Sequence, residues 1–300
     1  MPIEPFNTLF YRNCYYNLLF PILTYFGISV DTFMSHIIRT YELHNSTLSN
    51  RYIITKSDSD IFNDYGLVST DITIKSNHFF DAVQSEINNG NPLIISLKKK
   101  GKFDKLLLLV GYDDTLITAI EQKIPDVLSY AIVKKPINEI MQRHIGEEGR
   151  ADLFNSQIVF TRYCTTHKGA NETISACENY IKNYTHNKAP VEGGLELFKS
   201  WIKSLEINNS PLYCHDSIKA LDGIINSCRV AKEIVRSSES CSEMFALASD
   251  VESGWCFARN KLLKTFLSKN ILNSNLSVVL ETLAMIYDKE RKLLDKMMNW

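Results

Sequence analysis

Apolar residues recur every three or four positions near the start of the chain, which is the spacing of one helix face. Residues 14–26 carry this pattern, and Pro21 inside it removes a backbone hydrogen bond or kinks the helix. Residues 31–43 repeat the pattern behind Asp31, a suitable N-cap. The sequence therefore predicts two packed helices, the first of which begins at or just before Cys14.

The period changes to that of strands beyond a polar stretch near residues 45–60. Short turns such as Lys100-Gly101 and Asp113-Asp114 separate apolar and β-branched runs, which is typical of an antiparallel meander. The predicted strands are 67–74, 92–97, 105–112, 116–121, 128–133 and 157–163, and the predicted helices between them are 78–88 and 136–144.

Helical periods return beyond about residue 170, so the fold class predicted is α+β. We expect an α+β domain over residues 1–165 and a helical domain over 170–300 that packs on it, because no Gly/Ser/Pro-rich linker separates them. The apolar stripe of the last predicted helix, 276–299, can pack in the core or form a homodimer contact. The predicted helices are 171–184, 192–205, 216–236, 240–268 and 276–299.

Composition and charge narrow the classes of partner. Lys and Arg total 33 against 34 Asp and Glu, so no field of one sign attracts nucleic acid or an anionic membrane. The seven cysteines are an odd number without C-x-x-C pairs, which predicts reduced thiols in a cytoplasmic protein. No uncharged apolar run reaches the roughly 18 residues of a membrane span.

Known cofactor signatures are missing from the sequence. It has no Walker loop and no dinucleotide glycine fingerprint, so neither ATP nor NAD is inferred. Cys164 with His167 lacks the further ligands of a zinc site, and no metal is expected. The chain is therefore expected to bind no cofactor of its own.

Cys14 is the candidate nucleophile. Backbone N–H groups and the helix dipole at a helix N-terminus stabilise a thiolate and provide donors for an oxyanion. Cys14 can also be an inert, buried small residue, which is common for a cysteine in an apolar helix.

Two stretches of the sequence support Cys14 as a nucleophile, because they resemble motifs of known cysteine enzymes. NCYYNLLFPILTYFG (13–27) resembles the nucleophile helix of papain-like peptidases that cleave bacteriocin leader peptides, and FDKLLLLVGYDDTLITAIE (103–121) resembles their second motif. GGLELFKSWIKSLE (193–206) and SGWCFARNKLLKTF (253–266) are similar to parts of the butirosin-biosynthesis acyltransferase family. In the second motif the general-base position falls on Lys105 and the third triad position on Glu121.

The resemblance implies a papain-like acyltransferase of nonribosomal or other thiotemplated antibiotic biosynthesis. Cys14 would take an acyl or peptidyl group from the phosphopantetheine thioester of a carrier protein and pass it to a small amine, forming an amide. The carrier protein and the amine would be the partners. Lys98, Lys99, Lys100 and Lys102 beside the site would form either a docking edge for an acidic carrier or a solvated hairpin.

Lys105 departs from the family pattern, in which a histidine serves as the base. Lysine titrates near about 10.4 and histidine near about 6.5, so Lys105 can act as a base only if burial lowers its pKa, or it can pair with the thiolate. His78, His36 and His44 are the other imidazoles that could reach Cys14. The alternative is a catalytically reduced relative that keeps the fold to bind a carrier protein or peptide.

Overall fold

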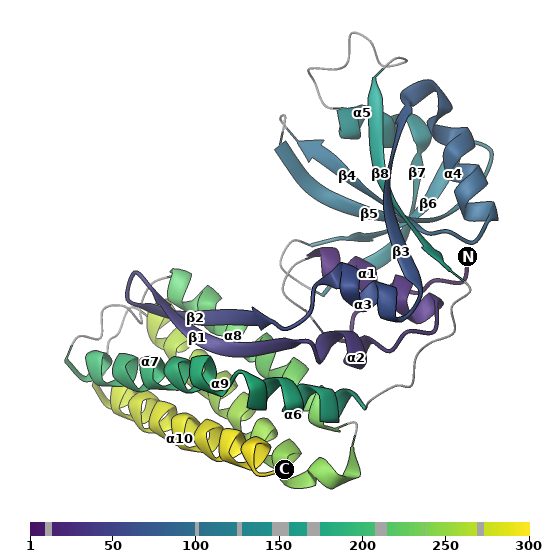
Figure 1. The fold of residues 1–300 in the computed structure, drawn as a ribbon. Helices are drawn as coiled ribbons and strands as arrows, with labels where there is room; N and C mark the ends of the chain where they lie inside the picture. Colours follow the sequence, from purple (N-terminus) through teal and green to yellow (C-terminus); the bar gives the residue numbers. More distant parts are fainter. Residues whose placement is uncertain are drawn as a thin grey trace. The chain divides into compact units, whose positions relative to one another are not determined.

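The computed structural model describes residues 1–9, 14–99, 102–124, 128–145, 156–166, 175–207, 215–236, 238–268 and 273–300 of the 300-residue chain (Figure 1). They form two compact units. The first contains Met1–Val30 and Ser57–Thr173, and the second contains Asp31–Lys56 and Ile174–Trp300. This division differs from the boundary predicted at residues 165–170, because 31–56 belong with the helical unit.

The first unit is built on a six-stranded antiparallel sheet, and the predicted meander over β4 to β7 is confirmed. Consecutive hairpins place β4, β5, β6 and β7 side by side, whereas β8 returns to lie between β3 and β4. The strands in spatial order are β3 (Leu67–Lys75), β8 (Gln157–Thr165), β4 (Leu93–Lys99), β5 (Lys102–Tyr112), β6 (Leu116–Gln122) and β7 (Tyr130–Pro136).

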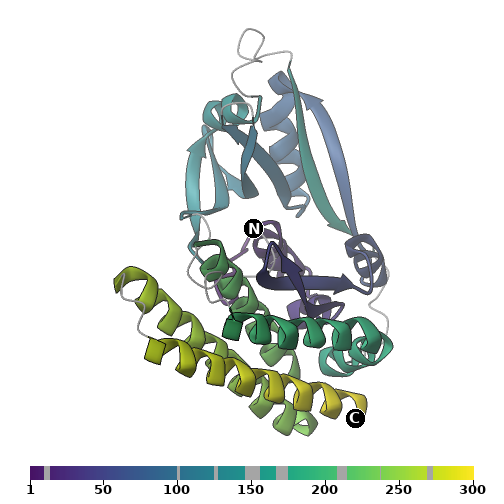
Figure 2. The same cartoon turned by 90° about the vertical axis from the view of Figure 1, so that its left-hand side faces the viewer.

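Two helices cover one face of this sheet. They are α4 (Phe79–Asn88), which follows the short 3-10 helix η1 (Ser76–His78), and α5 (Ile137–Ile145). Figure 2 shows both, coloured blue and teal, between the flanking strands of the sheet. Their apolar side chains share one core with alternate residues of the strands, including Leu107 and Leu109 of β5 and Ala119 of β6.

The other face packs against α1 (Cys14–Tyr25), which contacts β5 and β6, and against α3 (Asp58–Asp64). The helix predicted over 14–26 is confirmed, and Pro21 lies buried within it. Phe62 of α3 makes an edge contact with the ring of Tyr163 in β8. Tyr163 has the opposite parity to Ile158 and Phe160 of the α4/α5 core, so its side chain belongs to the α1 face.

The second unit begins with an element that the sequence predicted wrongly. The expected helix over 31–43 is a five-residue helix, α2 (Val30–Met34), followed by β1 (Ile37–His44), and the polar stretch near 45–60 contains β2 (Thr47–Ile54). Asn45 and Ser46 have φ of 48° and 64°, as a two-residue hairpin turn requires. The β-branched and aromatic side chains of 37–41 fit a strand, and their pairing with β2 outweighs the helical spacing.

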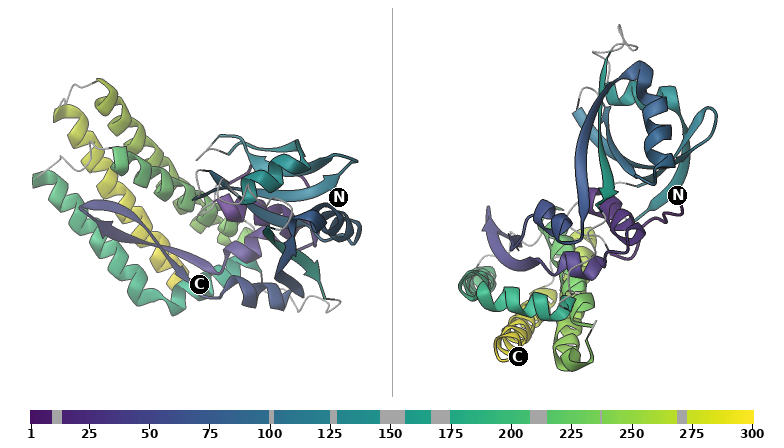
Figure 3. Two further views of the ribbon diagram at one scale, coloured as in Figure 1. Left: turned by 90° about the horizontal axis from the view of Figure 1, so that it is seen from above. Right: turned by 45° about the vertical axis from the view of Figure 1, so that its right-hand side comes forward.

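Within the described residues, six further elements belong to the second unit and confirm the helical C-terminal region. The hairpin packs on α7 and α8, and Figure 3 shows it lying along α7. The elements are α6 (Ala176–His186), α7 (Lys188–Ile207), α8 (His215–Arg236), the 3-10 helix η4 (Glu239–Cys241), α9 (Ser242–Ser268) and α10 (Asn273–Met298). Within the described residues, no helix combines the length and the apolar character that a membrane crossing requires.

Candidate functional site

Cys14 is the first described residue of α1, and its side chain is half-buried. The hydroxyl of Tyr130, at the start of β7, donates to the Cys14 carbonyl at 3.4 Å. Asn7 fixes Tyr130 in turn, because its side chain bonds the backbone carbonyl and N–H of Tyr130 at 2.8 and 2.9 Å. Burial, and then the charge of a Cys14 thiolate, raises the pKa of Tyr130, so this phenol remains a neutral donor.

Two further tyrosines, Tyr15 and Tyr16, connect the start of α1 to β8 and α3. The Tyr15 and Tyr163 hydroxyls lie 3.0 Å apart, and the Tyr16 hydroxyl donates to Asp58 at 3.2 Å. Burial raises the pKa of both Tyr15 and Tyr163. Tyrosine hydroxyls therefore hold the first turn of α1, and one of them donates to the Cys14 carbonyl.

Lys105 and Glu121 lie together in an ion pair. Lys105 Nζ is 3.0 Å from Glu121 Oε2, and the ammonium groups of Lys135 and Lys123 lie 3.2 and 3.3 Å from the same carboxylate. The Glu121 residue is only 4% exposed. Desolvation by burial raises its pKa, but the pairing with Lys105 and Lys135 outweighs that effect, so the net shift is downward.

This ion pair and Cys14 lie on opposite faces of the sheet. Lys105 is opposite Leu97, a member of the α4/α5 core, and Glu121 has the same parity as the core residue Ala119. Tyr130 is opposite Gln122, so it points to the α1 face, where it meets Cys14. The structure therefore brings Lys105 and Glu121 together and leaves Cys14 across the sheet from them.

The three histidines considered from the sequence belong to other elements than Cys14. His78 is exposed and directly precedes α4, on the face opposite α1. His36 and His44 belong to the second unit, where the imidazole of His36 lies beside Asn179. A fourth imidazole, His144, has a structural role: its Nε2 accepts from the Val159 N–H at 3.2 Å, which leaves Nδ1–H to donate to the Ser96 carbonyl at 2.6 Å.

The other residues considered from the sequence are the Asp113-Asp114 turn, the lysines near Lys100 and the candidate metal ligands. The Asp113-Asp114 turn is confirmed, since Asp113 Oδ1 accepts from the Leu116 N–H at 2.9 Å. His167, Lys100 and the side chains of Lys98, Lys99 and Lys102 lie outside the described residues. Within the residues that the structure does describe, no three His, Cys, Asp or Glu side chains gather in a metal-binding group.

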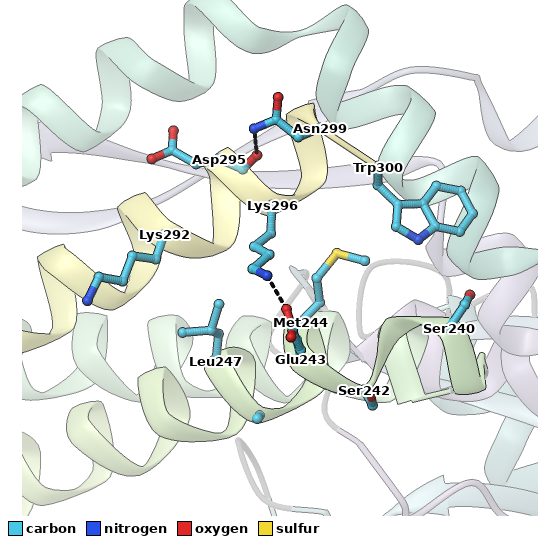
Figure 4. Close-up of a pocket in the computed structure, with 11 residues that line it drawn as sticks. Ser240, Ser242, Glu243, Met244, Leu247, Lys292, Asp295, Lys296, Asn299 and Trp300 are labelled. Atoms are coloured by element: carbon cyan, nitrogen blue, oxygen red, sulfur yellow. Dashed lines mark hydrogen bonds and ion pairs between the residues drawn. The ribbon is translucent and has the colours of Figure 1, made fainter.

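The second unit contains a cavity of about 940 Å³ between the start of α9 and the end of α10 (Figure 4). Met244, Leu247 and Trp300 contribute apolar surface, and an ion pair between Lys296 and Glu243 joins the two helices. No local sequence pattern predicted this cavity. Its walls are some 50 residues apart in the chain, and only the pairing of α9 with α10 brings them together.

No protein-family model matches this chain, and no curated protein matches it in sequence.

Proposed function

We propose that this chain is a papain-like protein, similar to the butirosin-biosynthesis acyltransferases, that binds an acylated carrier protein without base-driven acyl transfer. One observation carries this proposal: Lys105, at the histidine position of the motif, is paired with Glu121 on the sheet face opposite Cys14. A general base must lie within hydrogen-bonding reach of the proton that it removes. Loss of the imidazole from such a site costs several orders of magnitude in rate.

The charge around Glu121 supports an acidic partner. Lys105, Lys123 and Lys135 surround this carboxylate. Lys135 also pairs with Glu139, which Arg143 contacts in turn, so these four cations and two carboxylates have two positive charges in excess. The Lys123 side chain is 47% exposed, which leaves its ammonium group accessible. Carrier proteins are commonly acidic, and complementary charge increases the rate and specificity of association.

Acyl transfer through Cys14 is the second candidate function. The thiol is half-buried at the start of α1, where the helix dipole favours a thiolate. In this alternative, Cys14 accepts an aminoacyl or peptidyl group from the phosphopantetheine thioester, and a small amine then resolves the acyl-enzyme. The two candidates differ in whether a covalent adduct forms on Cys14.

The test uses the full chain and a carrier protein loaded with an aminoacyl thioester. We expect the carrier to bind, and Lys123→Glu to weaken binding by about tenfold, because it reverses one charge of the lysine group. Lys134→Glu is the matched control, since Lys134 is exposed on the same sheet but on the opposite face, paired with Asp113 at 3.1 Å. Intact mass measured without amine shows whether an acyl group is transferred.

The proposal expects binding, an unchanged mass, and equal binding by Cys14→Ala. An acyl adduct that maps to Cys14 and disappears in Cys14→Ala would show that the chain transfers acyl groups, which is the second candidate function. Absence of carrier binding, or equal weakening by Lys123→Glu and Lys134→Glu, would overturn the carrier-binding function.

A further inference from the structure

Two buried cysteines from distant parts of the chain meet in the second unit. Cys177 lies in the first turn of α6, and Cys241 ends η4, 64 residues later. Their Sγ atoms are 2.7 Å apart. Non-bonded heavy atoms make their best contact at about 3.5–4.0 Å, and a disulfide bond is about 2.0 Å long. The two sulfurs are therefore close enough to form a bond after a small movement of either side chain.

We propose that Cys177 and Cys241 are a redox modification site that closes to a disulfide when the protein meets a peroxide. One thiolate attacks a peroxide oxygen, forming an S–O bond as the O–O bond breaks and hydroxide leaves. The second sulfur then attacks the sulfenic sulfur, forming the S–S bond as the S–O bond breaks and water leaves. With hydrogen peroxide, two thiols give one disulfide and two waters.

The burial of the pair restricts it to a small oxidant and makes the reaction slow. Cys177 and Cys241 are both fully buried. Ser240 and Ser242, the chain neighbours of Cys241, both line the 940 Å³ cavity (Figure 4). Burial, and then the contact with Cys241, raises the pKa of Cys177, so little thiolate is present and the reaction is slow.

The bond would connect α6 to the turn that precedes α9. A crosslink stabilises the folded state mainly by restricting the unfolded chain, and more so for longer loops. The loop between Cys177 and Cys241 contains most of α6, all of α7 and all of α8. Oxidation should therefore stabilise the second unit against heat.

The experiment treats the reduced full chain with hydrogen peroxide, alkylates the remaining thiols under denaturing conditions, and maps peptides by mass spectrometry without reduction. We expect a crosslinked peptide pair containing Cys177 and Cys241, and a loss of two hydrogen masses from the intact chain. Thermal unfolding followed by tryptophan fluorescence should shift upward by about 5 °C. The probe is suitable because all three tryptophans, Trp201, Trp255 and Trp300, lie in the second unit.

Cys228→Ala is the matched control, because Cys228 is another buried thiol, whose pKa burial raises to about 12. This variant should retain the crosslink and the thermal shift, and Cys241→Ala should lose both. Mapping in the unmodified chain tests the proposal even if Cys241→Ala folds poorly. Sulfinic acid on Cys177 without a crosslink, a disulfide to another cysteine, or an unchanged thiol count would each overturn it.

Discussion

Lys105 Nζ lies 3.0 Å from Glu121 Oε2, on the sheet face that α4 and α5 cover. Cys14 starts the helix on the other face and contacts Tyr130 there. The two motif positions expected to serve one thiol therefore form a separate charged group. This separation has consequences that can be measured.

Glu121→Gln should destabilise the first unit by about 2 kcal/mol at neutral pH, because the amide removes the buried carboxylate from Lys105 and Lys123 and leaves Lys135 with only the exposed Glu139. Urea unfolding followed by circular dichroism measures this loss. Glu139→Gln is the control, since the Glu139 side chain is 43% exposed and its ion pairs with Lys135 and Arg143 should each contribute less than about 0.5 kcal/mol. Equal losses for the two variants would contradict the importance of the buried pair.

The effect of Glu121→Gln should depend on pH. The folded-state pKa of Glu121 is lowered, so its charge stabilises the fold above the unfolded value of 4.5. That contribution is lost as pH falls through the lower folded-state pKa. The difference between the original chain and Glu121→Gln should therefore be constant above the unfolded value of 4.5, and shrink as pH falls below it through the lowered folded-state pKa. A difference that grows on acidification would show the opposite shift.

Iodoacetamide should label Cys14 faster than Cys177, Cys228 and Cys241, because the last three are buried. Lys105→Met should leave the Cys14 rate unchanged within about twofold, since Lys105 lies across the sheet. Peptide mapping over a time course gives each rate. A marked slowing in Lys105→Met would mean that the lysine reaches the thiolate.

Two adjacent glycines of α7 should respond in opposite directions to alanine. A Cβ at Gly194 would overlap the Thr40 hydroxyl and lie 2.8 Å from the Tyr41 backbone nitrogen, so Gly194→Ala should cost about 1–3 kcal/mol. A Cβ at Gly193 meets nothing within 4 Å, and Gly193→Ala should stabilise the helix by about 0.5–1 kcal/mol. Urea unfolding followed by tryptophan fluorescence reports on this unit. Similar effects of both changes would refute the close packing of α7 on β1.

Glu290→Gln should destabilise the second unit by about 3 kcal/mol, because it leaves the buried Arg39 guanidinium without its counter-charge. Arg39 Nη2 lies 2.7 Å from Glu290 Oε1, which also accepts from the Tyr41 hydroxyl and the Trp255 indole. The same fluorescence assay measures the loss. Asp250→Asn, which removes an exposed pair with Lys289, should cost less than about 1 kcal/mol. A comparable loss in that variant would argue against a special role for the buried pair.

In the candidate site, motif spacing predicted which residues are partners but not which face of the sheet they occupy. Spacing identified Lys105 and Glu121 as partners, and the ion pair confirms that they meet. Spacing along a strand does not reveal which face of the sheet receives a helix from elsewhere in the chain. A residue's face depends on its register with neighbours such as Leu97 and on which helices cover that face.

Local periodicity and turn residues were sufficient to predict the helix that starts at Cys14, the hairpins of β4 to β7 and the helical C-terminal region. Only the tertiary structure decided that residues 37–54 are a hairpin. The spacing of their apolar residues fits both a helix and a strand. The strands form because β1 and β2 pair with each other and because α7 packs closely on β1 at Gly194. It also decided the contact of Cys177 with Cys241, since proximity across 64 residues comes from helix packing and leaves no local pattern.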